Sequence, residues 1–332
     1  MRMMWASVSS DKTHGYGVVG ARLYRAFKDL GVDLVRPDSF DWDVEVVTAL
    51  PMAWLIGGDF KRHDLVYHTM FEFYPVPPGW IDVLNRAGLV WFPSHFVQNL
   101  FNDCGLKTPS FVSGYGVDLD VFYSIDRRNR TGPLKYLIWG HKLTGRKNVL
   151  KTITAFIRAG LEDVELEVKV RSNMSASYIQ NELGEPYPNI TIFAEDWSTR
   201  ELADWLRRGD VLIYLSGGEG FGLQPLEAMA TGLPVICTDA TGMTEYLSED
   251  VAYLVPVTGK RVGDASYDLR FGGTFTCEEP DYDVAIELMR FVRYNIDDAR
   301  AKGLSAADYV SRVWTWDLQA KQALANISAF YL

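Results

Sequence analysis

Residues 211–227, VLIYLSGGEGFGLQPLE, place an apolar run, a glycine-rich loop and the start of a helix directly after one another. The run 211–215 is predicted as a buried strand, and 225–231 as a helix. Ligands of parallel sheets bind at the carboxyl ends of the strands, so the loop between these elements is the expected place for a site. Its glycines let the backbone approach a ligand closely, and the N–H groups at the helix start suit a phosphate.

The same alternation of apolar runs and amphipathic stretches extends through much of the chain. Ser198 with Glu201 three residues later forms a capping-box pattern before a further helix. Repeated strand–helix–strand units indicate parallel sheets with helices on both faces. The other predicted strands are 3–8, 32–35, 65–67, 89–92, 111–113, 136–139, 166–170 and 235–238, and the clearest other helices are 17–30, 94–101 and 148–159.

The polar stretch 123–135, YSIDRRNRTGPLK, is the candidate linker between two such runs. The fold class is therefore predicted as α/β, with two Rossmann-like doubly wound domains, 1–130 and 131–310, facing each other across a cleft. The last segment, 311–332, is expected as a helix that crosses back to the N-terminal domain. Residues 259–280, rich in Gly and Asp, are expected as an extended loop.

The composition excludes several classes of protein. The chain has 332 residues, of which 48% are hydrophobic and 23% charged, as in an ordinary globular protein and not in a disordered, collagenous or coiled-coil one. The net charge of −10 argues against avid binding of a nucleic-acid backbone.

The cysteines and the apolar runs indicate the compartment. Cys104, Cys237 and Cys277 lie far apart, which is typical of reduced thiols. No window approaches 18 uninterrupted apolar residues and no signal-peptide run is present, so we expect a cytoplasmic protein without a transmembrane segment. No His/Cys cluster has the spacing of metal ligands, so we expect no metal.

Glu219 and Glu227 bring two carboxylates to the glycine-rich loop and the helix that follows it. Carboxylates accept hydrogen bonds strongly, so sugar hydroxyls are natural partners for such a pair. The alternative is structural: Glu227 would stabilise the helix dipole, and Glu219 would be solvated.

With seven residues between the two glutamates, EGFGLQPLEAMATGLPVI resembles the signature of the retaining, nucleotide-sugar-dependent glycosyltransferases of group 1, which have the GT-B fold. Several further stretches resemble the same family. They are residues 69–96 (TMFEFYPVPPGWIDVLNRAGLVWFPSHF), 114–122 (GYGVDLDVF), 140–156 (GHKLTGRKNVLKTITAF) and 238–247 (TDATGMTEYL), together with Trp316.

The resemblance implies a role for each residue of the donor site. Glu219 contacts the donor sugar, Glu227 holds the ribose hydroxyls, and Lys147 binds the diphosphate. His141 stands where the family has an Arg, so Arg146, whose planar fork suits phosphate oxygens, is expected to supply that charge. The backbone of Gly220, Phe221, Gly222 and Leu223 is expected to cover the sugar and diphosphate, and Gly15 and Gly17 fit a first loop that faces the donor phosphates.

In the N-terminal domain the resemblance implies an acceptor site. His68 would line the cleft near the reacting sugar, with a satisfied core histidine as the alternative. Glu72 is a candidate for binding acceptor hydroxyls. The catalytic residues expected on this basis are Glu219, His68 and Lys147.

The expected reaction is transfer of a hexose from a UDP- or GDP-sugar co-substrate to an acceptor hydroxyl with retention, without a prosthetic group or a metal. The acceptor stays open among a glycan, a lipid carrier, a protein and a modified nucleobase, and the protein is expected as a monomer or homodimer. Two rivals remain. Gly15-Tyr-Gly-Val-Val-Gly20 is a literal GxGxxG, so an NAD-dependent oxidoreductase is one alternative, and a non-catalytic binder of the same fold is the other.

Overall fold

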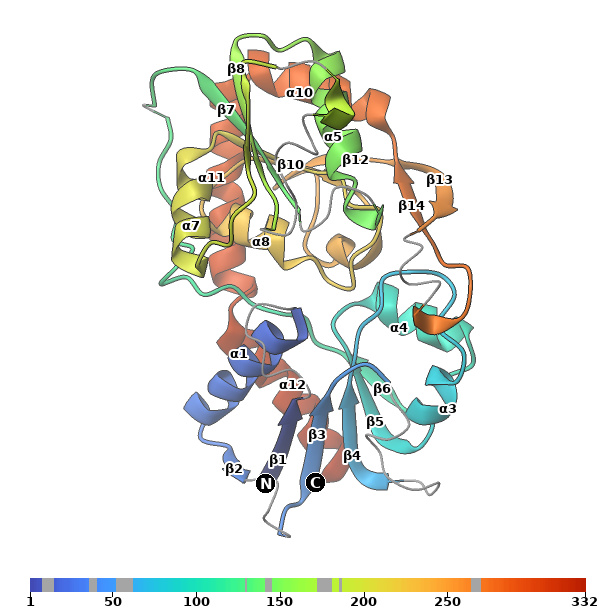
Figure 1. Cartoon of the computed structure of the whole chain (residues 1–332). Coiled ribbons are helices and arrows are strands. Elements are labelled where there is room, and N and C mark those ends of the chain that lie inside the picture. The colour runs from blue at the N-terminus through green and yellow to red at the C-terminus, as the bar shows by residue number, and fades with distance from the viewer. Residues whose placement is uncertain are drawn as a thin grey trace. The chain divides into compact units, whose positions relative to one another are not determined.

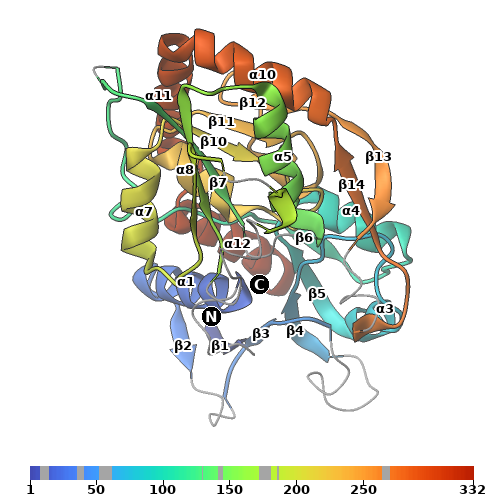
Figure 2. The same ribbon diagram turned by 45° about the horizontal axis from the view of Figure 1, so that its top comes forward.

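The computed structural model describes residues 1–7, 15–35, 41–51, 62–128, 130–140, 145–171, 181–184, 187–263 and 270–332. The chain divides into two compact units, each traced in Figures 1 and 2. Unit 1 comprises Met1–Gly116, Leu269–Gly273 and Trp314–Leu332, and unit 2 comprises Val117–Asp268 and Thr274–Val313.

Unit 1 is built on a parallel sheet with the strand order β2-β1-β3-β4-β5-β6. Large aromatic side chains fill its interior, among them Phe27, Trp91 and Phe101, all without exposed surface. The C-terminal helix packs against the first helix of this unit. The strands are β1 (Arg2–Ser7), β2 (Asp33–Val35), β3 (Val44–Thr48), β4 (Arg62–His68), β5 (Ala87–Phe92) and β6 (Ser110–Val112), and the helices are α1 (Gly15–Asp29), α3 (Trp80–Leu84), α4 (His95–Asp103) and α12 (Trp316–Tyr331).

Unit 2 has a second parallel sheet, in the order β12-β11-β10-β7-β8-β9. Its strands are β7 (Leu134–Trp139), β8 (Val164–Lys169), β9 (Ile190–Phe193), β10 (Val211–Tyr214), β11 (Val235–Thr238) and β12 (Tyr253–Val255). Its helices are α5 (Val149–Ala159), α7 (Thr199–Arg208), α8 (Leu223–Ala230), α10 (Tyr282–Tyr294) and α11 (Ile296–Val313), with 3-10 turns η1 (Gly145–Lys147) and η2 (Thr241–Glu245).

Helices cover both faces of the unit 2 sheet. In both ribbon views α5 and α10 lie on one side of it, and α7, α8 and α11 on the other. Strands β10 and β11 are buried at every position, which explains why their sequences are continuous apolar runs without alternation. Both units are therefore doubly wound α/β units, as the sequence predicts.

Helix α8 begins two residues earlier than predicted, at Leu223, because Gly222 takes a left-handed conformation (φ 89°) and starts it. Pro225 therefore lies within the first turn, where its missing N–H costs nothing. The predicted capping box of Ser198 and Glu201 is confirmed at the start of α7.

The expectation of an extended loop at residues 259–280 is wrong. Part of this stretch forms an antiparallel pair of strands, β13 (Val257–Val262) and β14 (Thr276–Pro280). Nearly all of β13 is exposed, so its sequence lacks the apolar alternation by which a half-buried strand is recognised.

The stretch expected as a linker is packed onto unit 2. Ile125 N–H donates to Thr231 O at 3.2 Å. Arg127 is 2% exposed, and its guanidinium donates to the carbonyls of Gly209 (3.0 Å), Leu206 (3.0 Å) and Thr231 (2.6 Å). The stretch is polar because it caps the ends of α7 and α8, where carbonyl groups lack helical partners.

None of the helices in the described part of the chain is both long and apolar enough to cross a membrane.

Candidate active site

The order of strands in unit 2 brings two distant loops together. The chain runs outward from β7 to β8 and β9 and then returns to place β10 on the other side of β7. The segments that follow β7 and β10 therefore meet at the carboxyl edge of the sheet, at the point where ligands of such sheets bind. The first carries Arg146 and Lys147 on η1, and the second carries Glu219.

Glu219 is a buried carboxylate held by several donors at one oxygen. Its Oε1 lies 2.8 Å from Arg146 Nη1 and 2.7 Å from Lys147 Nζ. The same oxygen lies 2.8 Å from the Tyr214 hydroxyl and accepts a hydrogen bond from Ser216 Oγ at 2.6 Å. The contacts with Arg146, Lys147, Tyr214 and Ser216 thus all converge on Oε1 of this carboxyl group.

The neighbouring cations keep Glu219 ionised. Burial by itself would raise the pKa of this carboxyl, but the charges of Arg146 and Lys147, with hydrogen bonds from Lys147 and Ser216, outweigh it and lower the pKa to about 2. Two cations face one carboxylate, so the cluster retains a positive charge. Such a cluster suits an anion larger in charge than a single carboxylate, as a diphosphate is.

Lys147 is held on the side away from solvent by two further polar groups. Its ammonium donates to Gln224 Oε1 at 2.9 Å and to the Tyr214 hydroxyl, and it lies 5.1 Å from the centre of the Tyr214 ring. The Tyr214 hydroxyl lies within hydrogen-bond distance of Glu219 Oε1 and of Gln224 Oε1 (2.6 Å). Because the hydroxyl has a single hydrogen, it can donate to only one of these oxygens at a time.

Gln224 keeps a buried donor without a partner. Its side chain is 8% exposed, and its Nε2 makes no hydrogen bond among the described residues. Its oxygen accepts from Lys147 and Tyr214, so the amide orientation is fixed and the NH2 cannot exchange places with it. A buried donor without a partner is costly, and a ligand oxygen at this edge would satisfy it.

Two glycines, one in the loop and one in η2, let backbone segments approach each other closely around Glu219. A Cβ at Gly217 would lie 2.2 Å from Glu278 O, and one at Gly242 would lie 2.2 Å from Gly220 O. Gly242 N–H donates to Glu219 O at 2.8 Å, and Glu219 N–H donates to Thr241 Oγ1 at 3.1 Å. The turn η2 therefore fixes the backbone of Glu219, and positions 217 and 242 have no space for a side chain.

Glu227 lies in helix α8 and is half-buried. Tyr246 OH donates to Gly222 O at 2.6 Å. Burial raises the pKa of Tyr246, and the charges of Glu219 and Glu227 raise it further. The bracketing of a ligand by Glu219 and Glu227 stays a prediction.

The remaining expected donor residues are placed as follows. Gly220, Phe221, Gly222 and Leu223 form the junction between the Glu219 loop and α8, and Phe221 is buried. Gly15 and Gly17 lie in the first turn of α1, in unit 1. His141 lies outside the described residues, so its role stays a prediction.

His68 ends β4 in unit 1 and has no exposed surface. Its Nε2 lies 3.0 Å from the Tyr115 hydroxyl, its Nδ1 lies 3.3 Å from Thr48 Oγ1, and its ring centre lies 4.3 Å from that of Trp91. Burial lowers the pKa of His68 to about 3, so the ring is neutral. This geometry favours the core-histidine alternative. Glu72 follows four residues later and is half-buried.

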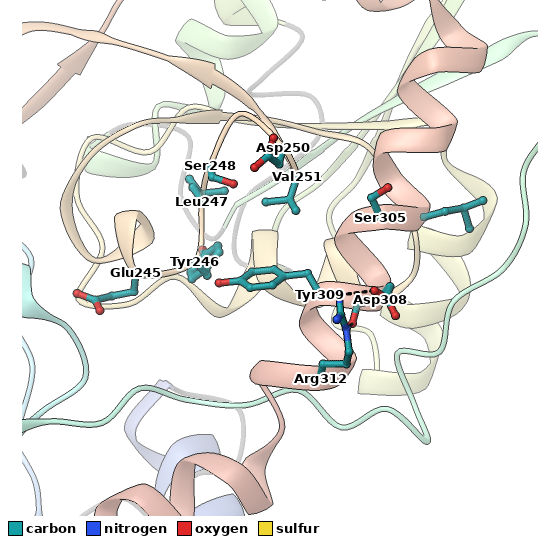
Figure 3. A pocket seen from close by; sticks show the side chains of 11 residues that line it. Glu245, Tyr246, Leu247, Ser248, Asp250, Val251, Ser305, Asp308, Tyr309 and Arg312 are labelled. Atoms are coloured by element: carbon teal, nitrogen blue, oxygen red, sulfur yellow. Dashed lines mark hydrogen bonds and ion pairs between the residues drawn. The ribbon is translucent and has the colours of Figure 1, made fainter.

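A pocket of about 870 Å³ in unit 2 lies beside this site and differs from it in charge (Figure 3). It lies between the segment around Tyr246 and helix α11. Its walls carry the carboxyl groups of Glu245, Asp250 and Asp308, and its Arg312 is paired with Asp308. A diphosphate would be repelled there, so we place the anion at Arg146 and Lys147 instead.

Tyr214, Ser216, Gln224 and Thr241 belong to the site but are not identified from the sequence. The signal for Tyr214 is its position at the carboxyl end of a buried strand, where a polar atom ends an apolar run. Thr241 has a positive φ of 59°, which the sequence does not reveal. Among the described residues, no three His, Cys, Asp or Glu side chains gather as metal ligands would.

Comparison with solved structures defines the class of fold. Sucrose-phosphate synthase from Thermosynechococcus elongatus superimposes with a TM-score of 0.75 over 99% of both chains at 14% identity. Anabaena HepE in complex with UDP-glucose gives a TM-score of 0.71 over 99% of this chain and 100% of that one, also at 14% identity. The chain has the GT-B glycosyltransferase fold, with its two doubly wound units.

Comparison with sequences points to the same kind of enzyme. Residues 135–264 match the model of the glycosyl transferases group 1. The D-inositol 3-phosphate glycosyltransferase of Paenarthrobacter aurescens is 31% identical over 161 residues, covering 42% of this chain and 37% of that protein. The one of Kribbella flavida is 30% identical over 167 residues, covering 45% and 39%. The chain thus spans under two fifths of the length of these curated relatives.

The oxidoreductase alternative is not supported, for two reasons. The family match and the structural likenesses are to glycosyltransferases. A dinucleotide fingerprint needs its glycines in the turn between strand and helix, whereas Gly15, Gly17 and Gly20 all lie inside α1.

Proposed function

We propose that this protein is a retaining glycosyltransferase that moves a hexose from a nucleotide-diphosphate sugar to an acceptor hydroxyl. The observation that carries the proposal is the buried cluster of Glu219 with Arg146 and Lys147 at the switch point of the unit 2 sheet. In this cluster two cations, which suit a diphosphate, directly contact a carboxylate, which suits the hydroxyl groups of a sugar. Retention is taken from the resemblance of the glutamate pair and its surroundings to the retaining family.

In the proposed complex, Arg146 and Lys147 bind the diphosphate, and the backbone from Gly220 to Leu223 covers it. Positive charge beside the diphosphate stabilises the leaving group as the glycosidic bond breaks, in a site whose donors are already in place. Protein cations supply this charge, so the proposal includes no metal.

The two carboxylates orient the donor. Glu219 Oε1 is held by the protein, and Oε2 accepts a hydrogen bond from a sugar hydroxyl. Glu227, on α8, accepts from the ribose. The unpartnered Gln224 Nε2 donates to a donor oxygen, which relieves the cost of its burial in the free protein. These assignments make Glu219 and Lys147 the catalytic residues and leave His68 as a structural residue of unit 1.

The donor nucleotide is UDP or GDP. Solved structures of HepE are described in complex with UDP and with UDP-glucose, which makes UDP-glucose the first probe. Acceptor binding is assigned to unit 1 and the acceptor chemistry stays open among a glycan, a lipid carrier, a protein and a nucleobase.

The test is a comparison of ligands on one protein preparation. Melting temperature is measured with UDP, GDP, UDP-glucose, a GDP-hexose and NADH, and the stabilising sugar nucleotide is then followed by NMR for hydrolysis or transfer. We expect stabilisation by one sugar nucleotide and release of a sugar whose anomeric configuration matches that of the donor. Stabilisation by NADH alone, or an inverted product, would overturn the proposal.

A further inference from the structure

The hairpin of β13 and β14 contacts both loops of the candidate site, although the family match ends at residue 264, before β14 begins. Arg261 of β13 reaches one loop with its guanidinium, and the backbone of Glu278 of β14 reaches the other. The hairpin is therefore placed to affect the donor site without contributing a group that touches the donor.

Arg261 binds both ends of the turn that presents the two cations. Its Nη2 donates to Gly145 O at 2.8 Å and to Asn148 Oδ1, the residues that directly precede and follow Arg146 and Lys147. Its Nε pairs with Glu279 on the neighbouring strand. The side chain is 20% exposed, so these hydrogen bonds from a charged donor are sheltered from solvent and worth more than surface ones.

Asn148 needs such support because it has a left-handed backbone (φ 53°) that residues other than glycine rarely adopt. It is 2% exposed, and its side-chain NH2 donates to Leu215 O at 2.8 Å, which ties the turn to the end of β10. Arg261 satisfies the other side-chain atom. The two bonds hold this rarely adopted backbone conformation in place.

The second strand supports the Glu219 loop at the same time. Glu278 N–H donates to Gly217 O at 2.8 Å, and Gly217 N–H donates to Arg146 O at 2.7 Å. The backbone of the cation turn, the backbone of the Glu219 loop and the hairpin thus form one chain of hydrogen bonds. Without Arg261, the turn loses one hydrogen bond at each of its two ends, at Gly145 and at Asn148.

We propose that Arg261 is a positioning residue for donor binding, which acts by fixing the turn Gly145–Lys147 so that Arg146 and Lys147 meet the diphosphate. The proposal rests on the proposed function, since it assigns the diphosphate to these two cations. Arg261 has its own charge engaged by Glu279, and it is not a ligand of the donor.

The test compares Arg261→Ala with Glu279→Gln. Glu279→Gln removes the pair with Arg261 and the pair with Lys151 Nζ (2.6 Å), so it weakens the hairpin, but it leaves the bonds of Arg261 to Gly145 and Asn148. We expect Arg261→Ala to raise the Kd for UDP by about tenfold, because Arg146 and Lys147 are then no longer held in the position that meets the diphosphate. Glu279→Gln is expected to leave that Kd within about twofold, and Arg261→Lys, which can still reach one acceptor, to fall between them.

Amide hydrogen exchange supplies a readout that needs no ligand. We expect the amides of Asn148 and Gly217 to exchange faster in Arg261→Ala and unchanged in Glu279→Gln. Equal losses of affinity in the two variants would reduce Arg261 to a structural residue of the hairpin and overturn the proposal, as would unchanged exchange at both amides. If the unmutated protein bound no sugar nucleotide, the proposed function would fail, while the exchange comparison would still decide whether Arg261 fixes the turn.

Discussion

Lys147 Nζ lies 2.7 Å from Glu219 Oε1, although 71 residues separate them in the chain. The two side chains have different assignments in the proposed complex, one to the diphosphate and the other to the sugar. Because the two side chains are in direct contact, the carboxylate of Glu219 partly neutralises the positive charge of Lys147 when no donor is bound. A donor must therefore bind to a cluster that is already partly neutralised.

Replacing Glu219 by Gln should separate nucleotide binding from transfer. The neutral amide removes the negative charge beside Arg146 and Lys147, so UDP without a sugar should bind more tightly, by about threefold to tenfold. Sugar transfer should fall by about a hundredfold, because a charged contact to the reacting sugar is lost.

Isothermal titration and a transfer assay measure the two effects. Glu245→Gln is the matched control, because that carboxylate lies in the neighbouring pocket and is expected to change neither quantity. Weaker UDP binding in Glu219→Gln would contradict the idea that the carboxylate competes with the diphosphate.

The same cluster predicts a pH dependence of stability. The pKa of Glu219 falls from its ordinary 4.5 to about 2 in the folded protein. A carboxyl whose pKa is lower in the folded state stabilises the fold when ionised, and this contribution is lost as the pH falls from about 4.5 to about 2. Urea unfolding at several pH values should show the wild type more stable than Glu219→Gln at neutral pH, with the difference shrinking below about pH 4.5. A difference independent of pH would exclude the ion cluster as its source.

Lys147 and Lys151 offer a comparison within one short segment. Lys147→Met should raise the Kd for UDP-glucose by about tenfold or more, because it removes a charged contact to the diphosphate and leaves Glu219 short of one cation. Lys151 pairs with Glu279 at the surface, with 49% of its side chain exposed, and such pairs contribute little. Lys151→Met should leave the Kd within about twofold, and equal effects of the two substitutions would remove Lys147 from the donor site.

The fold could be predicted from the sequence wherever buried positions are occupied by a recognisable run of apolar residues. Strands β10 and β11 are buried at every position and appear as apolar runs, and Ser198 and Glu201 cap a helix by local hydrogen bonds alone. The pairing of β13 and β14 could not be predicted, because β13 is almost wholly exposed and the paired residues, from Val262 with Thr276 to Val257 with Pro280, lie 14 to 23 positions apart. The hairpin's contribution to the site through Arg261 depends on that pairing.

The candidate site was predictable in part for the same reason. Glu219 and Lys147 stand in recognisable local patterns, and each could be proposed without knowing its partner. Their contact depends on the return of β10 beside β7, which is a property of strand order and not of either segment. Tyr214 and Gln224 complete the contact from positions that, taken alone, resemble core and helix residues.

Arg127 and Arg128 are neighbours in sequence, and their substitution by Ala should have very different costs. Arg127 is buried, and its guanidinium donates to carbonyls at the ends of α7 and α8, so its removal takes one charged donor from each of three buried carbonyl groups. Burial lowers the pKa of Arg127 to about 10, yet the group stays protonated at neutral pH and all its donors remain available. We expect Arg127→Ala to reduce the free energy of unfolding by about 3 kcal/mol.

Arg128 is exposed and binds Asp126 two residues away, so Arg128→Ala should leave the free energy of unfolding nearly unchanged. Urea unfolding of the two variants measures both values. Since Arg127 touches neither Glu219 nor the cation turn in the recorded contacts, UDP binding by the folded fraction of Arg127→Ala should be unchanged. A small cost at Arg127 would mean that water replaces the guanidinium at those carbonyls, and that the polar stretch 123–135 behaves as a linker after all.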